Sequence, residues 1–465
     1  MLGCLFGEAG IDRCDGGPGA NTVSGCELTV RRSTADTRPI AVGQCSKIGA
    51  VTVDALDLIS SAHYGEFGPP HRQWAELRAQ PLRYVEPEGH EHFWAVTRHA
   101  DIMEISSRPE DFCNGEGIVL LTDQQVRRRE SSQIPVAMKT IIEMDPPEHG
   151  VFRRVASRYF TPRGIERLAE IVDQSARSVI DALGAEGEAD FVTEVTQRHP
   201  LRVLSTILGI EPEQEEQLLE LTAQLFGGDD PELQREGETR EQAGIELFMD
   251  FYEMFNTIIQ DRRANPRDDL ATMLATATLE NGEPLGDIET LGYYLIVFNA
   301  GHDTTRHSLT GALQAFLDNP DQLTRLRDDS SLMKTAVEEV VRYVAPVNYM
   351  KRTATHDLVF DGHDIAKGDM FALFYASANR DETVFEDPDR FDVGRSPNRH
   401  LGFGWAEHYC LGAHLARASI TALLQQLAAR MEWMEPAGPP EYVASSFVVG
   451  PKHLPVRYRL AQPPG

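Results

Sequence analysis

The stretch FGWAEHYCLGAHLAR, Phe403 to Arg417, places one cysteine between an aromatic, glycine-containing turn and an expected helix. The residues after Cys410 have helical spacing and few helix breakers, so Cys410 lies just before or at a helix N-terminus. Unpaired backbone N–H groups and the helix dipole favour negative charge at that end. We therefore expect a lowered pKa for the Cys410 thiol and a stable thiolate.

A thiolate at this place fits two kinds of chemistry. It can bind a metal, and Gly404 and Gly412, which lack side chains, would then let the backbone approach a large flat cofactor. It can also be the nucleophile of a cysteine hydrolase. The chain has no CxxCH sequence, which excludes covalent attachment of a c-type haem. The residues around Cys410 alone leave both alternatives open.

A second stretch, Asp287 to Asn319, keeps a helical pattern along its whole length. At ~1.5 Å per residue it would form a rod about 50 Å long. Its apolar centre is interrupted by AGHDTT, Ala300 to Thr305. A new helix with Asp303 as its N-cap is the alternative, but it leaves the helical pattern of the preceding LGYYLIVF unexplained. Because glycine costs ~1 kcal/mol inside a helix, we expect one long helix that is distorted here for a functional reason.

Shorter patterns predict the other elements. HFWAVTRHADIMEI indicates a strand running into a helix, and LVFDGHDIAKGDMFALF indicates a hairpin turning at Asp361-Gly362 with a further strand behind it. The segment from Val151 to Leu183 indicates two helices broken near Thr161-Pro162. Residues 1–48 are rich in Gly, Ser, Thr and Asp without periodicity, so we expect a disordered extension. Residues 49–465 show neither linker nor repeat and are expected to form a single domain.

Composition limits the possible functions. The chain is 41% hydrophobic and 25% charged, which is typical of a soluble globular protein. No apolar run approaches the ~20 residues needed to span a bilayer, and the N-terminus lacks the features of a secretory signal. We therefore expect a cytoplasmic protein. The net charge of −28 argues against binding to nucleic acid and against a membrane surface rich in anionic lipid.

Five motifs, in a consistent order along the chain, resemble those of the cytochrome P450 family. The resemblance implies a mainly α fold with small β-sheets, built as one large domain with a long central helix over the haem. The motifs are HxxxR at His149 and Arg153, AGxDTT from Ala300 to Thr305, ExxR at Glu339 and Arg342, a meander-like segment from Ala378 to Asp392, and the cysteine loop.

In this family the cofactor is haem b, iron protoporphyrin IX. The resemblance implies that Cys410 is the proximal iron ligand and the metal-binding residue. It also implies that His149, Arg153, Arg352 and His408 pair with the haem propionates. The other implied cofactor contacts are Phe403 near the sulfur, Gly301 where oxygen needs room, and Ala300, Gly404 and Gly412. Ala406 departs from the family, which usually has glycine there, so the turn is expected to carry a strain of about 1 kcal/mol.

The implied activity rests on Asp303 and Thr304, which match the acid–alcohol pair that delivers protons during oxygen activation. Peroxide-driven relatives typically lack this pair, so its presence favours O2 and two externally supplied electrons. We expect a monooxygenase that hydroxylates a compact hydrophobic substrate, terpenoid or aromatic, because NRHLGFGW and the C-terminal tract look most like the terpineol-hydroxylating bacterial subgroup. The alternatives are a haem-thiolate gas sensor without turnover and a steroid or fatty acyl hydroxylase of the same family.

The family's substrate-facing segments correspond here to GIVLLTDQ, the helix centre near Val297, APVNYM and ASSFVVG. They are largely apolar, with Asn348, Tyr349 and Ser446 as candidate hydrogen-bond partners for a substrate.

No flavin or nicotinamide module is found, so the electrons are expected from an iron–sulfur ferredoxin with its reductase, acting on a monomer. An acidic ferredoxin would be repelled by a charge of −28 unless the docking face is locally basic. The candidates for that face are Arg153, Arg154, Arg158 and Arg163, with Arg127, Arg128 and Arg129 upstream.

Overall fold

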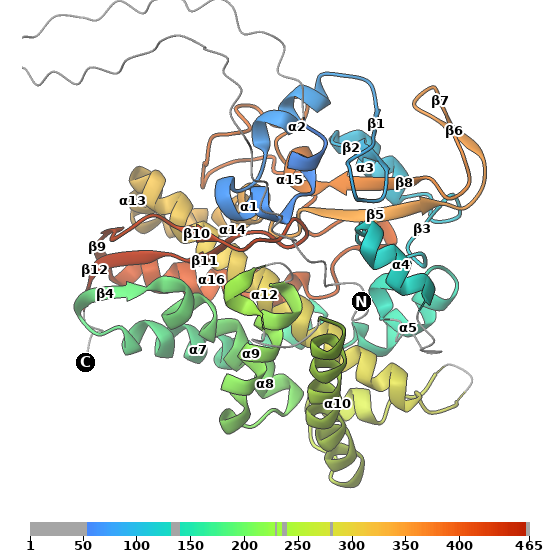
Figure 1. Ribbon diagram of the computed structural model, residues 1–465. Helices are drawn as coiled ribbons and strands as arrows, with labels where there is room; N and C mark the ends of the chain where they lie inside the picture. Colours follow the sequence, from blue (N-terminus) through green and yellow to red (C-terminus); the bar gives the residue numbers. More distant parts are fainter. Residues whose placement is uncertain (1–53, 132–139, 228–229, 235–239, 280–281, 462–465) are drawn as a thin grey trace, which may run out of the picture. The chain divides into compact units, whose positions relative to one another are not determined.

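The computed structural model describes residues 54–461, except 132–139, 228–229, 235–239 and 280–281. The described residues fall into one compact unit that is mainly helical with small β-sheets (Figure 1). The expected extension over residues 1–48 lies outside the described residues. Among the described residues, no helix is both long and apolar enough to cross a membrane.

The long central helix is α12, Asp287–Asp318. It runs without a break through Gly301, which confirms one continuous helix rather than a new start at Asp303. Within it the hydroxyl of Thr304 donates to the carbonyl of Ala300 at 2.6 Å. Asn319 is the C-cap and not a helical residue, because the backbone there leaves the helical region.

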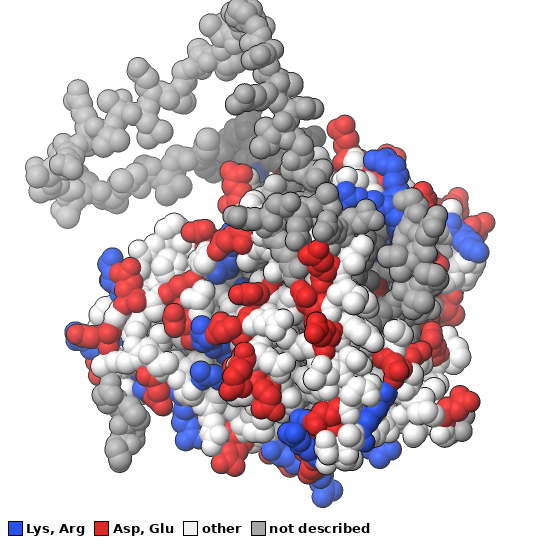
Figure 2. All heavy atoms as spheres, turned by 60° about the horizontal axis from the view of Figure 1, so that its bottom comes forward, with Lys and Arg blue, Asp and Glu red and all other residues white. Residues whose placement is uncertain are grey.

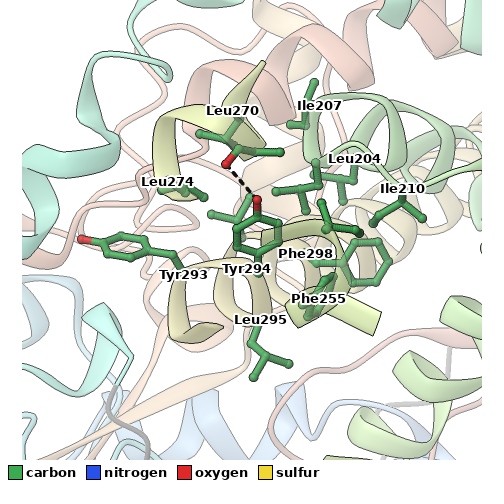
Figure 3. Close-up of a cluster of buried hydrophobic side chains, with 14 of the residues drawn as sticks. Leu204, Ile207, Ile210, Phe255, Leu270, Leu274, Tyr293, Tyr294, Leu295 and Phe298 are labelled. Carbon is green, nitrogen blue, oxygen red and sulfur yellow. Dashed lines mark hydrogen bonds between the residues drawn. The ribbon is translucent and has the colours of Figure 1, made fainter. Parts of the chain in front are cut away.

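Helices from both halves of the chain surround α12 (Figure 1). Figure 3 shows the core between them, where Phe298 and Tyr294 of α12 pack with Leu204 and Phe255. The Tyr294 hydroxyl donates to the carbonyl of Ala271 at 2.8 Å, so this buried polar group is satisfied. The helices in direct contact with α12 are α8 (Arg198–Leu208), α9 (Glu215–Phe226), α10 (Arg240–Ala264), α11 (Leu270–Ala275), α13 (Pro320–Asp328), α14 (Met333–Val344) and α16 (Ala413–Arg430).

The five-stranded sheet lies to one side of the helices (Figure 1), with strand order β1-β2-β8-β5-β3. Only β2 and β8 pair in parallel. The predicted strand-to-helix segment is confirmed as β2 and α3, and the predicted hairpin as β6 and β7 with β8 behind it. Asp361 and Gly362 form the turn between β6 and β7, with φ of 48° and 78°. The bounds are β1 Arg83–Val85, β2 Phe93–Val96, α3 His99–Ser106, β3 Phe112–Cys113, β5 Tyr349–Ala354, β6 Leu358–Phe360, β7 His363–Ile365 and β8 Met370–Phe374.

The remaining elements complete the described part of the chain. Two smaller sheets have the orders β4-β12-β9 and β10-β11. The bounds are α1 Ser61–Phe67, α2 His71–Arg78, α4 Asp123–Ser131, β4 Glu186–Asp190, α15 Tyr375–Ala378, β9 Met431–Pro436, β10 Glu441–Tyr442, β11 Pro451–His453 and β12 Pro455–Leu460.

The segment from Val151 to Leu183 contains the predicted break at Thr161-Pro162, but it holds three helices instead of two. They are α5 (Glu148–Ser157), α6 (Pro162–Glu166) and α7 (Ala169–Ala182). The hydroxyl of Thr161 caps α6 by accepting from the N–H of Gly164 at 3.1 Å. The second break, before α7, has no Pro or Gly signal, and buried Ile165 and Leu168 fix it through tertiary packing.

The ExxR pair on α14 is fully buried. Both side chains are 0% exposed, which rules out an ordinary surface ion pair. The Arg342 guanidinium donates to both oxygens of Glu339 at 2.8 and 2.9 Å, and also to the carbonyls of Asn379 and Pro388. Glu339 also accepts from the backbone N–H of Asp392 at 2.9 Å. The pair therefore ties α14 to the irregular segment before the cysteine loop.

Candidate functional site

A mainly apolar cavity lies between the centre of α12 and the loop that precedes α16. The cavity volume is ≈ 280 Å³. Thr304 lines it, whereas Asp303 does not. All the expected cofactor contacts lie in its wall, namely His149, Arg153, Ala300, Gly301, Arg352, Phe403, Gly404, His408, Cys410 and Gly412.

The cysteine loop is held by its own backbone. The N–H of Cys410 donates to the carbonyl of Phe403 at 2.8 Å, and the N–H of Gly404 donates to that of Leu401 at 2.8 Å. Gly404 and Ala406 have φ of 72° and 56°, so both lie in the left-handed region. Ala406 therefore adopts the conformation expected for it, one that L residues with a side chain reach only with strain.

The Cys410 thiol is exposed because it faces the cavity. Burial among the surrounding protein atoms raises its pKa, while the N–H of Gly412, Arg153 and Arg417 act in the opposite direction. The expectation of a lowered pKa is therefore wrong, since desolvation outweighs the helix N-terminus. A thiolate here needs a stronger positive partner, which a metal ion supplies.

The structure also bears on the cysteine hydrolase alternative. Such an enzyme needs a general base in hydrogen-bond contact with its thiol. Within the described part of the chain, no histidine or carboxylate side chain forms a hydrogen bond with the Cys410 sulfur. The geometry therefore favours Cys410 as a ligand rather than as a nucleophile.

Four cationic or hydrogen-bonding side chains gather at one side of the cavity. The imidazole rings of His149 and His408 stack with centroids 4.1 Å apart. Burial, together with the neighbouring Arg352, His149 and Arg153, lowers the pKa of His408 to about 2. Neither Arg153 nor Arg352 forms an ion pair with any carboxylate that the structure describes.

This surplus of positive charge fits a ligand that carries carboxylates. The Nε2 atom of His408 is buried and has no partner among the described residues. A carboxylate beside it would satisfy this nitrogen and offset the charges of the two arginines. Next to Cys410, a Cβ added at Gly412 would meet no protein atom within 4 Å, so the backbone there faces open space. A thiol, open backbone and a cationic rim are together what a haem with two propionates requires.

Gly301 contributes to packing as well as to the cavity. A Cβ at this position would lie 3.1 Å from Leu204 Cδ2 and 3.3 Å from its Cδ1. The glycine therefore lets α8 approach α12 closely. The role expected for Gly301, to leave room for oxygen in the cavity, stays a prediction.

Asp303 and Thr304 point to different sides of α12. The Thr304 hydroxyl faces the cavity side and donates to Ala300, whereas Asp303 faces a second, polar hollow. There its carboxylate accepts from Arg306 Nε at 2.8 Å, and His307 Nε2 lies 3.4 Å away. Although burial opposes ionisation, Arg306 and His307 hold the pKa of Asp303 well below its ordinary value. The structure thus brings Thr304, but not the carboxylate of Asp303, to the cavity.

Of the candidate hydrogen-bond partners for a substrate, Asn348 and Tyr349 already bond within the protein, although Asn348 Oδ1 has no partner among the described residues. Asn348 Nδ2 donates to the hydroxyl of Tyr64 and to the carbonyl of Ser446, both at 2.7 Å. The hydroxyl of Tyr349 accepts from the N–H of Leu120 at 3.2 Å. None of Asn348, Tyr349 and Ser446 lines the cavity, although their neighbours Val347, Met350 and Phe447 do.

Two residues of the cavity wall were missed from the sequence. Asn299 Oδ1 and Thr140 Oγ1 are buried and have no partner among the described residues. Asn299 directly precedes the AGxDTT motif, and this position on α12 was the one available signal. Its isolation from other polar groups depends on long-range packing, which no local pattern reveals.

Of the arginines expected to form the docking face, Arg153 forms a hydrogen bond to the cysteine loop. Arg153 is half-buried and bonds to the carbonyl of Tyr409, so its side chain is turned inward. Arg154, Arg158 and Arg163 are exposed. Figure 2 shows acidic and basic side chains interspersed over one face of the protein, with no single-sign surface. On this face, any basic docking surface is therefore local.

Comparisons with known proteins agree with this geometry. The model of the family described as Cytochrome P450 matches residues 119–456. "Cytochrome P450-terp" of Pseudomonas sp is 39% identical, over 82% of this chain and 91% of the relative. "Steroid C26-monooxygenase" of Mycolicibacterium smegmatis is 34% identical over 84% and 90%, and "Linalool 8-monooxygenase" of Pseudomonas putida is 35% identical over 83% and 94%. The crystal structure of CYP108D1 from Novosphingobium aromaticivorans superposes with a TM-score of 0.80 at 36% identity, over 89% of this chain and 100% of that one.

Proposed function

Since the chain belongs to the cytochrome P450 family and is a cytochrome P450 monooxygenase, we propose that it hydroxylates a compact hydrophobic substrate of terpenoid or aromatic type. Membership of the family implies a haem cofactor, O2, a substrate and a redox partner. The observation that carries the proposal is the apolar cavity that adjoins both the Cys410 thiol and Thr304.

The shape of the wall supports a compact substrate. Aliphatic and aromatic side chains from five separate regions of the chain face the cavity, so most of a bound molecule would lose its contact with water. Two of the relatives reported above are a P450-terp and a linalool monooxygenase. The apolar side chains include Val203, Leu204, Leu225, Leu295, Val297, Met350, Phe447 and Val448.

A steroid is the second candidate, and one observation favours it. A steroid C26-monooxygenase matches nearly the same share of this chain at 34% identity. A steroid nucleus is longer and more rigid than a monoterpenoid, so the two candidates predict different ligand sizes.

We propose non-covalent haem b as the cofactor, with Cys410 as its proximal ligand. Bound haem would supply the iron centre at which O2 is reduced and its O–O bond is cleaved. His149, Arg153, Arg352 and His408 would hold the propionates. Phe403 would cover the sulfur, where its carbonyl already accepts from the Cys410 N–H.

Thr304 is proposed as the residue that directs protons to the reacting oxygen. Its hydroxyl lies at the cavity and can exchange its bond to the Ala300 carbonyl for a bond to water or to oxygen. Asp303 would resupply protons from the opposite side of α12. To do so, its carboxylate must leave Arg306 or relay the proton through water in the polar hollow.

We propose that a ferredoxin with its reductase delivers the electrons near the cysteine loop. Exposed Arg154 and Arg158 on and after α5 would attract an acidic partner despite the net charge of −28.

The experiment is a ligand screen on the purified ferric protein. Compact terpenoids and aromatic hydrocarbons should displace the water on the iron and shift the absorption spectrum, and those that bind should be hydroxylated with ferredoxin and its reductase. If only steroids shift the spectrum and are converted, the second candidate is correct. If ligands bind but none is converted, the proposed hydroxylation is wrong.

A further inference from the structure

Asn299 is a polar residue with no hydrogen-bond partner in an otherwise apolar part of the cavity wall. It lies on α12, is 6% exposed and lines the cavity. Its side chain forms no hydrogen bond with any residue that the structure describes, and its Oδ1 is fully buried. Leaving a buried polar group unpaired destabilises a protein by about 1–3 kcal/mol. A side chain in this position therefore points to a ligand that completes it.

The neighbouring polar residues of α12 differ in this respect. The hydroxyl of Thr304 donates to Ala300 at 2.6 Å, and that of Ser308 donates to Thr304 at 2.9 Å. On the other side of the helix, His302 Nε2 lies 3.0 Å from the carbonyl of Gln197. Each of these groups is used by the fold itself. Asn299 has no such structural use.

The apolar surroundings make the Asn299 amide selective for an oxygen atom of a bound molecule. Nearby positions on α12 that face the cavity are Leu295, Ile296 and Val297, and Leu204 faces it from α8. Hydrocarbon side chains offer no hydrogen bond, so an oxygen of a bound molecule gains most at the amide. A hydrogen bond in such a water-poor site is also stronger than one in water.

We infer that Asn299 binds an oxygen atom of the substrate, so that the preferred substrate is a compact hydrophobic alcohol or ketone rather than a pure hydrocarbon. The inference rests on the proposed function. An amide can turn about its last side-chain bond at little cost, so it can present either its donor or its acceptor end. A hydroxyl group satisfies both orientations, whereas a ketone satisfies only the donor.

The position of Asn299 also predicts where oxidation occurs. Asn299 precedes Thr304 by five residues, which places their Cα atoms about 7.5 Å apart along the helix axis. A substrate whose oxygen is held at Asn299 therefore presents a distant carbon, several bonds away, to the region near Thr304. Oxidation should occur at the end of the molecule remote from its existing oxygen.

The test compares two ligands with the same carbon skeleton, adamantane and its tertiary alcohol. Their dissociation constants are measured by calorimetry and by the absorption shift of the ferric protein. The wild type should bind the alcohol about tenfold more tightly, as one net hydrogen bond provides. Asn299→Leu, which keeps a similar volume, should bind both equally and bind adamantane at least as well as the wild type.

Two controls isolate the amide. Ser308→Ala removes another polar group of the wall and should retain the preference for the alcohol. Thr140→Val removes another unpartnered group of the wall and should retain the preference as well. If Asn299→Leu does not retain haem, Asn299→Val and Asn299→Ser take its place, and the serine variant should keep part of the preference.

The outcomes separate this inference from the proposed function. Equal binding of the two ligands by the wild type, or a preference that survives in Asn299→Leu, overturns the role of Asn299 while leaving a hydrophobic substrate intact. Loss of the preference in Thr140→Val instead also overturns it. If neither ligand binds the wild type, the compact-substrate proposal and the inference both fail.

Discussion

Adjacent residues of an α-helix point about 100° apart and can serve different sides of it, and α12 gives the clearest case. Thr304 faces the cavity, whereas adjacent Asp303 is paired with Arg306 and His307 in a polar hollow behind it. Because the two groups are separated, their removal should have separate effects on turnover.

Thr304→Ala should uncouple electron use from product formation. Alanine keeps a helix-compatible residue, so folding and substrate binding should survive. Without the hydroxyl, protons would be misdirected and reduced oxygen would leave as hydrogen peroxide. We expect product per nicotinamide cofactor oxidised to fall by about tenfold while peroxide rises. Both are assayed in one reaction, and a wild-type ratio of product to cofactor would remove the role assigned to Thr304.

Asp303→Asn should instead slow the whole cycle. The amide is close in size to the carboxylate but cannot resupply protons, so electron consumption should fall by roughly 100-fold with the product ratio largely kept. The carbon monoxide spectrum serves as the control for intact haem binding. Unchanged electron consumption in a correctly folded variant would show that protons arrive by another route.

At the scale of elements, the pair Glu339–Arg342 fastens α14 to the segment before the cysteine loop. Breaking a buried ion pair leaves one charge without a partner and costs about 3–5 kcal/mol. Arg342→Leu should therefore lower the free energy of unfolding by this amount and reduce haem retention.

A matched control for this prediction is Arg457→Leu. Arg457 Nε pairs with Glu188 at 3.0 Å, but both side chains are more than half exposed, so its removal should change stability by less than about 1 kcal/mol. Urea unfolding of both variants gives the comparison. Similar losses in the two variants would contradict the fastening role.

The same elements show how far sequence reasoning reaches. The long helix and the break at Thr161-Pro162 follow from local sequence patterns and were therefore predictable. The break before α7 was not, because tertiary packing fixes it without Pro or Gly. The partners of polar side chains were not predictable either. The Nδ2 of Asn348 donates to Tyr64, 284 positions away, while no described residue bonds to the side chain of Asn299.

The residues that the local motifs singled out as cofactor contacts line one cavity. HxxxR, AGxDTT and the cysteine loop each occupy one helix or one tight turn, so their side chains keep a fixed relation to the backbone. The pKa of Cys410 was predicted with the wrong sign, because the helix N-terminus is visible in the sequence whereas the degree of burial is not.

For the whole molecule, the dominant property is a net charge of −28. An acidic electron donor would meet a repulsive field, so we expect its recognition to depend on the exposed arginines Arg154 and Arg158. Because the Debye length falls from ~10 Å at 0.1 M salt to ~3 Å at 1 M, reduction by ferredoxin should slow as salt rises.

Charge reversal at the docking arginines tests this directly. Arg154→Glu or Arg158→Glu should weaken reduction most, whereas Arg457→Glu, which makes the same charge change on β12, should leave it near the wild-type rate. Stopped-flow reduction by ferredoxin measures the effect. Salt-independent reduction with all three variants alike would exclude this docking face.

The central claim is that Cys410 provides the thiolate ligand of a haem. The direct measurement is the absorption spectrum of the reduced protein with carbon monoxide, recorded for the wild type and for Cys410→Ser. Thiolate ligation predicts a strongly red-shifted band in the wild type that is absent in the serine variant, even where haem is retained. A red-shifted band that persists in Cys410→Ser would contradict the claim.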